Sequence, residues 1–299
     1  MLRINGLTKR YKRFPVLLGL DMHIDKGDVY GFLGTNGCGK TTTMNLICNV
    51  IPKDEGEITF ENKDCRIGYL PESPSLYGYM NGYEYLNYIG ACCRWEGDTE
   101  ARTAEVLEIT GMTDGAARLI KGYSRGMNQR IGIAAALYAK PDLLILDEPT
   151  SALDPAGRAD VMEIIRRLAR TGATIILCTH ILTDVERVAN KIGIMKDGVM
   201  AVEGTLGQVR ARFASACVIN VRLRDYRADT VNALTAIDLV ARNEFYDSYG
   251  VTLFAKDGVD EKELYRCVVE TLAEKDICPE GIEFRRLTLE QIYMSVTGG

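Results

Sequence analysis

Residues 34–42, GTNGCGKTT, have the types and spacing of a phosphate-binding loop, GxxxxGKS/T. The glycines let backbone N–H groups point at phosphate oxygens, Lys40 supplies a positive charge to the β- and γ-phosphates, and the Thr41 hydroxyl can ligate Mg²⁺. An apolar strand precedes the loop and a helix follows it, which disfavours a ligand-free glycine turn. The predicted phosphate-binding residues are Gly34, Thr35, Asn36, Gly37, Cys38, Gly39, Lys40, Thr41 and Thr42.

Two acidic residues, Asp147 and Glu148, follow the apolar run LLIL, which is typical of a strand buried on both faces. Ligands of an open parallel sheet bind at the carboxyl ends of its strands. An acidic pair after a strand is usually part of a solvated turn, but a phosphate loop in the same chain favours a role for the pair in the phosphate site. Asp147 is predicted to hold Mg²⁺, directly or through water. Glu148 is predicted to orient and polarise the attacking water as a general base.

A second potential anion site lies in the stretch YSRGM, residues 123–127. Ser124 is a good N-cap for the apolar helical run IGIAAALYA that follows, and Gly126 lets a ligand approach the backbone. A helix N-terminus with these features attracts anions. The sequence therefore contains two phosphate sites far apart, and the second one needs a reason.

Several motifs in one order give the chain a family resemblance. Residues 1 to about 209 resemble the nucleotide-binding subunit of an ATP-binding cassette (ABC) transporter, in which YSRGM corresponds to the signature loop and SALD, residues 151–154, to the D-loop. The resemblance implies that ATP and Mg²⁺ are the ligands. It also implies that His180 binds the γ-phosphate and that the Tyr11 ring stacks on adenine. The implied catalytic residues are Glu148, His180 and Lys40.

Two departures from the family pattern indicate one branch of the family. Glu72 stands where the family commonly has glutamine; its carboxylate can approach Mg²⁺ or water, beside Thr41 and Asp147, but adds negative charge. Arg125 replaces a signature glycine and can place a cation near phosphate. These variants, and the ending LTLEQIYMSVTGG, resemble the bacterial branch of drug, antibiotic and polysaccharide exporters, whose ATPase is a separate chain.

The resemblance also explains the second phosphate site. Cassettes of this family pair head to tail, so that the phosphate loop of one faces the signature loop of the other. Ser124 and Gly126 are then expected to serve the ATP of a second copy, or of a homologous cassette. The other implied partner is a polytopic membrane permease, which would hold the chain at the cytoplasmic face of the cell membrane.

Composition limits the remaining classes of function. The chain has 299 residues and a net charge of −5, which argues against broad binding of nucleic acid. Its nine cysteines include no CxxC pair, which is typical of reduced thiols. The first residues lack the apolar region of a signal peptide, and no apolar run approaches the roughly 18 residues that span a bilayer. We therefore expect a soluble protein.

The elements that must position these residues form an α/β pattern. Residues 1–209 are expected to be a P-loop NTPase core with an antiparallel β subdomain and a helical signature subdomain at about 73–130. Residues 210–299 read as β-α-β-β-α-β followed by a last helix, which suggests a small α+β, ferredoxin-like accessory or regulatory domain.

Two other functions remain open at this point. A soluble ABC-type ATPase of translation or DNA repair would usually have two fused cassettes, long coiled coils or zinc cysteines, and none of these is visible. A nucleotide-gated sensor would use residues 210–299 as its ligand or partner module. A transporter motor is favoured over both, and export over import rests on the branch resemblance alone.

Overall fold

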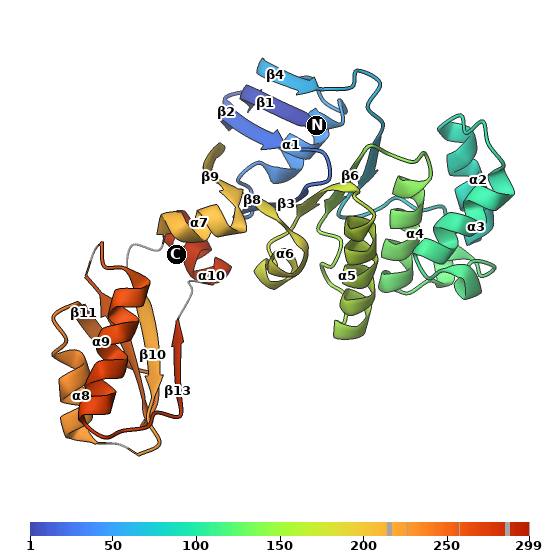
Figure 1. Ribbon diagram of the computed structural model, residues 1–299. Helices are drawn as coiled ribbons and strands as arrows, with labels where there is room; N and C mark the ends of the chain where they lie inside the picture. The colour runs from blue at the N-terminus through green and yellow to red at the C-terminus, as the bar shows by residue number, and fades with distance from the viewer. Residues whose placement is uncertain (214–216, 226, 257, 285–287, 299) are drawn as a thin grey trace. The chain divides into compact units, whose positions relative to one another are not determined.

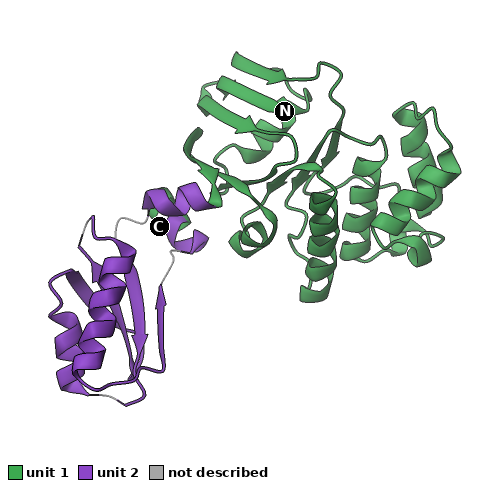
Figure 2. Ribbon diagram, in the orientation of Figure 1, with its two compact units in different colours: residues 1–206, 293–299 green, residues 207–292 purple. Residues whose placement is uncertain are grey.

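The computed structural model describes residues 1–298 except 214–216, 226, 257 and 285–287. It divides into two compact units, residues 1–206 with 293–299, and residues 207–292 (Figure 2). We call them unit 1 and unit 2. Residues 210–299 were expected to form the second domain, whereas Tyr293 and the described residues after it belong to unit 1.

Unit 1 is built on a six-stranded sheet with the order β5-β6-β7-β3-β8-β9. The first five strands are parallel, and β9 pairs antiparallel with β8. Its strands are β3 (Val29–Gly34), β5 (Ile67–Leu70), β6 (Leu143–Asp147), β7 (Thr174–Cys178), β8 (Lys191–Lys196) and β9 (Val199–Thr205). Every residue of β3, β6 and β7 is buried, as their continuous apolar sequences predict.

Helices cover both faces of this sheet. Helix α1 (Lys40–Ile47) lies on one face, and α4 (Arg125–Leu137), α5 (Pro155–Arg170) and α6 (Leu182–Val188) lie on the other (Figure 1). A smaller antiparallel sheet, ordered β2-β1-β4, shares a core with α1 and the central sheet. Its strands are β1 (Leu2–Tyr11), β2 (Phe14–Ile24) and β4 (Glu55–Phe60). These two sheets are the predicted P-loop core and antiparallel subdomain.

The helical subdomain contains α2 (Gly82–Cys92), α3 (Thr99–Ile109) and α4, with the short 3₁₀ turns η1 (Thr113–Gly115) and η2 (Ile120–Gly122). Asn81 and Glu84 form a capping box that starts α2. Arg102 of α3 is 5% exposed and donates to the carbonyl oxygens of Leu137 and Tyr138 at the end of α4. This buried guanidinium fixes α3 against the helix that Ser124 begins.

Unit 2 follows the predicted β-α-β-β-α-β order. Its antiparallel sheet is ordered β11-β12-β10-β13, with two helices against an aliphatic core. The elements are β10 (Val218–Arg222), α8 (Ala228–Thr235), β11 (Val240–Phe245), β12 (Gly250–Ala255), α9 (Glu261–Glu274) and β13 (Gly281–Phe284). The last strand of that order is expected over IEFRRL, residues 282–287, of which 285–287 lie outside the described residues.

Two further helices complete the chain, α7 (Leu206–Phe213) and α10 (Leu289–Thr297). Lys196 of β8 donates to the carbonyl oxygen of Val296 at 3.2 Å, so the last residues are bound to unit 1. Among the described residues, no helix combines the length and the apolar character needed to cross a bilayer.

Candidate functional site

A cleft of about 620 Å³ opens at the carboxyl ends of β3, β6 and β7. This is the edge where ligands of parallel α/β sheets bind. It brings together ten of the residues that the sequence singled out, from four separate parts of the chain. The lining residues are Val16, Asn36, Gly37, Gly39, Lys40, Thr41, Thr42, Glu72, Asp147, Glu148, Ser151 and His180.

The phosphate loop connects β3 to α1. Gly37 and Gly39 have φ values of 80° and 111°, which side chains with a Cβ rarely adopt. At Gly39 a Cβ would also lie 2.8 Å from Leu17 Cδ2. Lys40 is 8% exposed, and its Nζ donates to the carbonyl oxygens of Gly34 at 2.8 Å and Thr35 at 3.1 Å. The loop therefore folds around the ammonium group of Lys40, the first residue of α1.

Asp147 and Thr41 meet across the floor of the cleft. The Thr41 hydroxyl donates to Asp147 Oδ2 at 3.1 Å, and Asp147 is 1% exposed. Burial raises the pKa of the Asp147 carboxyl, the hydrogen bonds from Cys178 and Thr41 oppose the rise, and the charges of Glu148 and Glu72 add to it. Hydroxyl and carboxylate oxygens are the ligands that Mg²⁺ prefers. The pair therefore fits a divalent cation, which would also relieve the crowding of negative charge.

Glu148 adopts an unusual backbone conformation and is held by several donors. Its φ is 49°, and its N–H donates to the Cys178 carbonyl oxygen at 2.7 Å. Its carboxylate accepts from the His180 N–H at 3.1 Å and from the Thr179 hydroxyl at 3.2 Å. His180 Nδ1 lies 2.9 Å from both carboxylate oxygens. The Glu148 side chain is 10% exposed and that of His180 is 54% exposed, so the pair presents a fixed carboxylate to the cleft.

Ser124 caps α4 as predicted but lies apart from this cleft. Its hydroxyl accepts from the Met127 N–H at 3.2 Å. Neither Ser124 nor Gly126 lines the cleft. A neighbouring hollow of about 420 Å³ includes Arg125, and it shares Glu72 and Ser151 with the cleft. The signature loop is thus near the phosphate site of its own chain without contributing to it.

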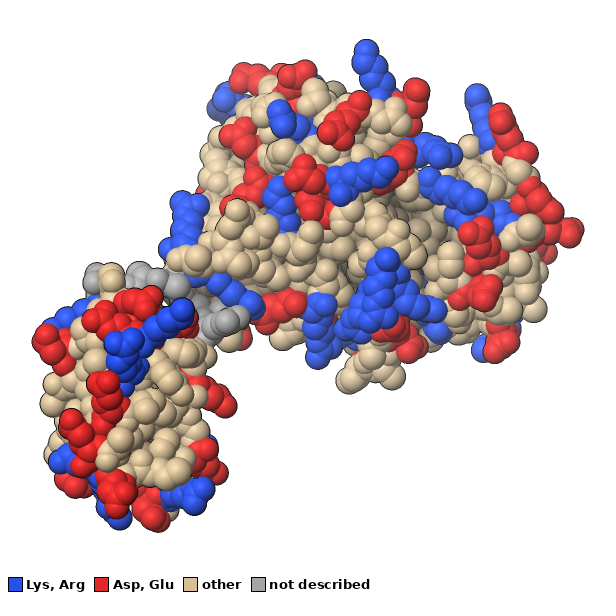
Figure 3. All heavy atoms as spheres, viewed as in Figure 1, with Lys and Arg blue, Asp and Glu red and all other residues tan. Residues whose placement is uncertain are grey.

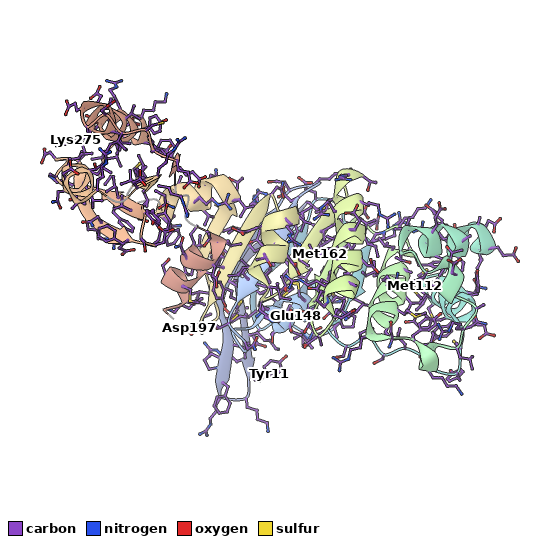
Figure 4. All side chains as sticks on the ribbon, turned by 90° about the horizontal axis from the view of Figure 1, so that it is seen from below. Tyr11, Met112, Glu148, Met162, Asp197 and Lys275 are labelled. Carbon is purple, nitrogen blue, oxygen red and sulfur yellow. The ribbon has the colours of Figure 1, made fainter. Side chains whose placement is uncertain are left out.

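Four other predicted residues also lie outside the lining: Tyr11, Gly34, Thr35 and Cys38. Gly34 and Thr35 contribute through their carbonyl oxygens to Lys40. Cys38 is buried beneath the loop. Tyr11 lies near the tip of β1 and β2 with 47% of its surface exposed, and the Lys9 Nζ is 5.7 Å from its ring centre (Figure 4).

Sequence reasoning missed Val16 and Thr179 as parts of the site. Val16 comes from β2, which belongs to the other sheet, so no local pattern links it to the phosphate loop. Thr179 directly precedes His180, and a hydroxyl next to a strand-end histidine was a readable signal. Ser151, which the SALD motif contains, also lines the cleft.

The comparisons with known proteins agree with this arrangement. The family model described as ABC transporter matches residues 17–151. The linearmycin resistance ATP-binding protein LnrL of Bacillus subtilis (strain 168) is 31% identical over 100% of this chain and 98% of its own length. The daunorubicin resistance ATP-binding protein DrrA3 of Streptomyces coeruleorubidus is 32% identical over 99% of this chain and 95% of its own.

A solved structure shows the same fold. The dimeric structure of MJ0796, a bacterial ABC transporter cassette, matches with a TM-score of 0.62 and 25% identity, over 69% of this chain and 99% of that one. The fold and the cleft define a P-loop ATPase. The chain belongs to the ATP-binding proteins of ABC transporters, and it is the ATP-hydrolysing subunit of such a transporter.

Proposed function

We propose that this chain drives the export of antibiotic-like compounds through a separate polytopic permease at the cytoplasmic face of the membrane. One observation carries the proposal: the similarity to the two antibiotic resistance proteins runs over nearly the whole chain, unit 2 included. A similarity limited to the cassette would support any ABC ATPase. The cleft supports the ATPase step, and the relatives' names support the cargo class.

ATP is proposed to place its phosphates in the phosphate loop. Lys40, now bonded to two loop carbonyl oxygens, would transfer its donors to the β- and γ-phosphates. Thr41 and Asp147 would hold Mg²⁺, and Glu72, which lines the same cleft, is a further oxygen ligand that could do so directly or through water. When bound, the ion would supply positive charge that offsets the negative charge developing on the phosphates. Such ions need few protein ligands because phosphates and waters supply the rest.

Glu148 is the proposed general base and His180 its partner at the γ-phosphate. The Glu148 carboxylate is oriented by donors from Thr179 and His180, which leaves few alternative positions for it. A base must lie within hydrogen-bond reach of the water it activates, so this restriction favours catalysis. The exposed part of the His180 ring faces the cleft, where it can donate to phosphate.

The complete site is proposed to form between two cassettes. Ser124 and Gly126 stand at the N-terminus of α4 and line no part of their own chain's cleft. The N-terminal N–H groups and dipole of that helix can stabilise the γ-phosphate of a second copy or a homologous cassette. A two-fold axis would then make two composite sites.

Mixing two inactive variants tests the composite site. Ser124→Arg blocks the signature side and Lys40→Ala disables the phosphate side, so each variant alone has both sites damaged. In a mixed dimer one site carries both defects and the other is intact. Phosphate release should therefore reappear on mixing, at a rate set by the fraction of mixed dimers. A monomer that hydrolyses ATP at full rate, independently of protein concentration, contradicts the shared site.

Export is tested with the membrane protein encoded beside this chain. Cells that express both proteins should accumulate less of a lipophilic antibiotic than cells that express the membrane protein with the Glu148→Gln chain. The chain should also co-purify with that membrane protein in detergent. Co-purification with ribosomes or DNA instead, and equal antibiotic accumulation in both strains, would favour a soluble ABC-type ATPase. Equal accumulation together with a ligand-dependent ATPase rate of the isolated chain would favour a nucleotide-gated sensor.

A further inference from the structure

A fully buried carboxylate, Asp184 of α6, lies next to the site without lining it. Its Oδ2 accepts from the Thr150 hydroxyl at 2.8 Å. Arg158 of α5 donates to it from Nε at 3.0 and 3.1 Å and from Nη2 at 2.8 Å. Asp184 is 0% exposed, and a buried charge is retained only where such donors compensate its lost hydration.

The two partners of Asp184 stand on either side of one loop. Thr150 precedes and Arg158 follows the D-loop segment, residues 151–154, and the start of α5. Ala152, inside this loop, has a left-handed backbone with φ 56°, and so does Glu148 with φ 49°, two residues before Thr150. Each such conformation costs on the order of 1–3 kcal/mol and persists only where surrounding contacts enforce it. Asp184 supplies such contacts on both sides of Ala152 and, through Thr150, two residues after Glu148.

Asp184 also belongs to the segment that carries His180. Its N–H donates to the Ile181 carbonyl oxygen at 3.1 Å, which closes the first turn of α6 directly after His180. Val185 packs so closely on β3 that a Cβ on Gly31 would lie 2.3 Å from Val185 Cγ1. Helix α6 is therefore fixed on the sheet. Through Asp184, it fixes the Glu148 loop as well.

We propose that Asp184 is a positioning residue, which aligns Glu148 and Ser151 with His180 by holding Thr150 and Arg158. The inference rests on the proposed roles of Glu148 and His180. The phosphate loop makes none of these contacts, so ATP binding does not depend on them. Loss of the contacts therefore lowers kcat and leaves KM for ATP nearly unchanged, because only the alignment of water and base is disturbed.

Two substitutions at Thr150 separate positioning from packing. Thr150→Ser keeps the hydroxyl and loses a methyl group, whereas Thr150→Val keeps the shape and loses the hydroxyl. Positioning predicts a near-normal kcat for Thr150→Ser and a kcat reduced by roughly 10- to 100-fold for Thr150→Val, with KM within about twofold. Packing alone predicts the reverse order, because this 2% exposed position tolerates the isosteric change better. That reverse order would overturn the proposal.

Two arginines of α5 provide a matched control. Arg158→Gln removes the Asp184 contact, whereas Arg166→Gln removes a pair with Glu163 that stays within the helix. Arg158→Gln should lower kcat and Arg166→Gln should not. Adding Thr150→Val to Arg158→Gln should cost less than the product of the single effects, because both act through one carboxylate. Equal kcat in both arginine variants, with all proteins folded by thermal melting, would refute the role of Asp184.

The same rate measurements test the role of Glu148 separately from the role of Asp184. If the Glu148→Gln variant hydrolyses ATP as fast as the wild type does, Glu148 is not the base, and this inference fails with that role. Hydrolysis that requires Glu148 but is unchanged in Thr150→Val and Arg158→Gln would overturn only the inference.

Discussion

The two units of the chain differ in whether they bury charged side chains. Among the described residues of unit 1, six charged side chains are buried. Four of them lie in or beside the cleft, namely Lys40, Asp147, Glu148 and Asp184, and the other two are Lys9 and Arg102. Among the described residues of unit 2, the buried polar side chains are Thr230 and Thr252, and none is charged. Charges of both signs are interspersed over the face of unit 2 that is visible in Figure 3.

This difference separates the unit that contains the cleft from a unit whose charged side chains all stay exposed or half-buried among the described residues. The exposed ion pairs of unit 2, such as Lys256 with Asp238 at 2.9 Å, are screened by solvent and contribute little to stability. Its stability comes from an aliphatic core that includes Leu253, Leu264 and Val268. Unit 1 instead buries charged side chains, and four of the six lie in or beside the cleft, where they can serve catalysis. The comparison predicts that substitutions in the two units will affect different observables.

The largest effect is expected at Glu148. Glu148→Gln should still bind ATP while phosphate release falls by about 10²–10⁴-fold, because the amide cannot act as a base. Lys40→Ala should instead weaken ATP binding, because Lys40 serves the phosphates before the reaction starts. Steady-state phosphate release and binding of a fluorescent ATP analogue measure the two properties. Normal hydrolysis by Glu148→Gln would remove Glu148 from the role of base.

Local sequence patterns predicted the parts of unit 1 that depend on neighbours in sequence. The phosphate loop and the Ser124 cap have short-range signals, and the structure contains the glycine loop before α1 and the cap of α4. The element order of unit 2 was readable from strand alternation for the same reason.

Contacts between distant segments had no such signal. Asp184 is 26 residues from Arg158 and 34 from Thr150, and its position in a polar-looking helix gave no sign of complete burial. The direct contact between Glu148 and His180, and the return of residues 293–299 to unit 1, depend in the same way on how segments pack. Patterns of period 2 or 3.6 specify a face but not the partner of that face.

In unit 2, truncating the core should affect stability rather than chemistry. Leu264 is 0% exposed on α9, and Leu264→Ala should lower the free energy of unfolding of unit 2 by about 2–5 kcal/mol. KM for ATP should remain as in the wild type at temperatures where both units stay folded. Val269→Ala, at a 38% exposed position of the same helix, is the control and should change little. A large rise in KM for Leu264→Ala alone would show that unit 2 takes part in ATP binding.

A smaller effect is expected at Tyr11. If adenine stacks on this ring, Tyr11→Ala should raise KM for ATP and GTP alike, by an amount equivalent to roughly 1–3 kcal/mol of stacking. Phe14, its 76% exposed partner across the β1–β2 pair, provides an aromatic control at the same tip, and Phe14→Ala should leave both KM values unchanged. Loss of ATP binding with GTP unaffected would indicate recognition of the adenine edge instead.

The smallest effect is expected on stability, from one ion pair in each unit. In unit 1 the Lys9 ammonium, with the Arg10 N–H, holds the pKa of Asp54 below its usual value, and the Lys9 side chain is only 9% exposed. In unit 2 Lys256 lowers the pKa of Asp238 in the same way, but both groups are exposed. Solvent screens the second pair more completely, so its contribution should be the smaller one.

The sign of the pH dependence follows from these depressed pKa values. Each aspartate stabilises the fold while it is ionised, so its contribution is complete above the unfolded pKa of about 3.9 and is lost as pH falls through the lower folded pKa. Urea unfolding of the wild type, Asp54→Asn and Asp238→Asn should be measured from pH 7 to pH 3. The difference between wild type and Asp54→Asn should be constant above about pH 5 and shrink below it, whereas the difference for Asp238→Asn should be near zero throughout. A larger difference for Asp238→Asn would mean that unit 2 relies on its surface charges for stability, and the contrast between the two units would then fail.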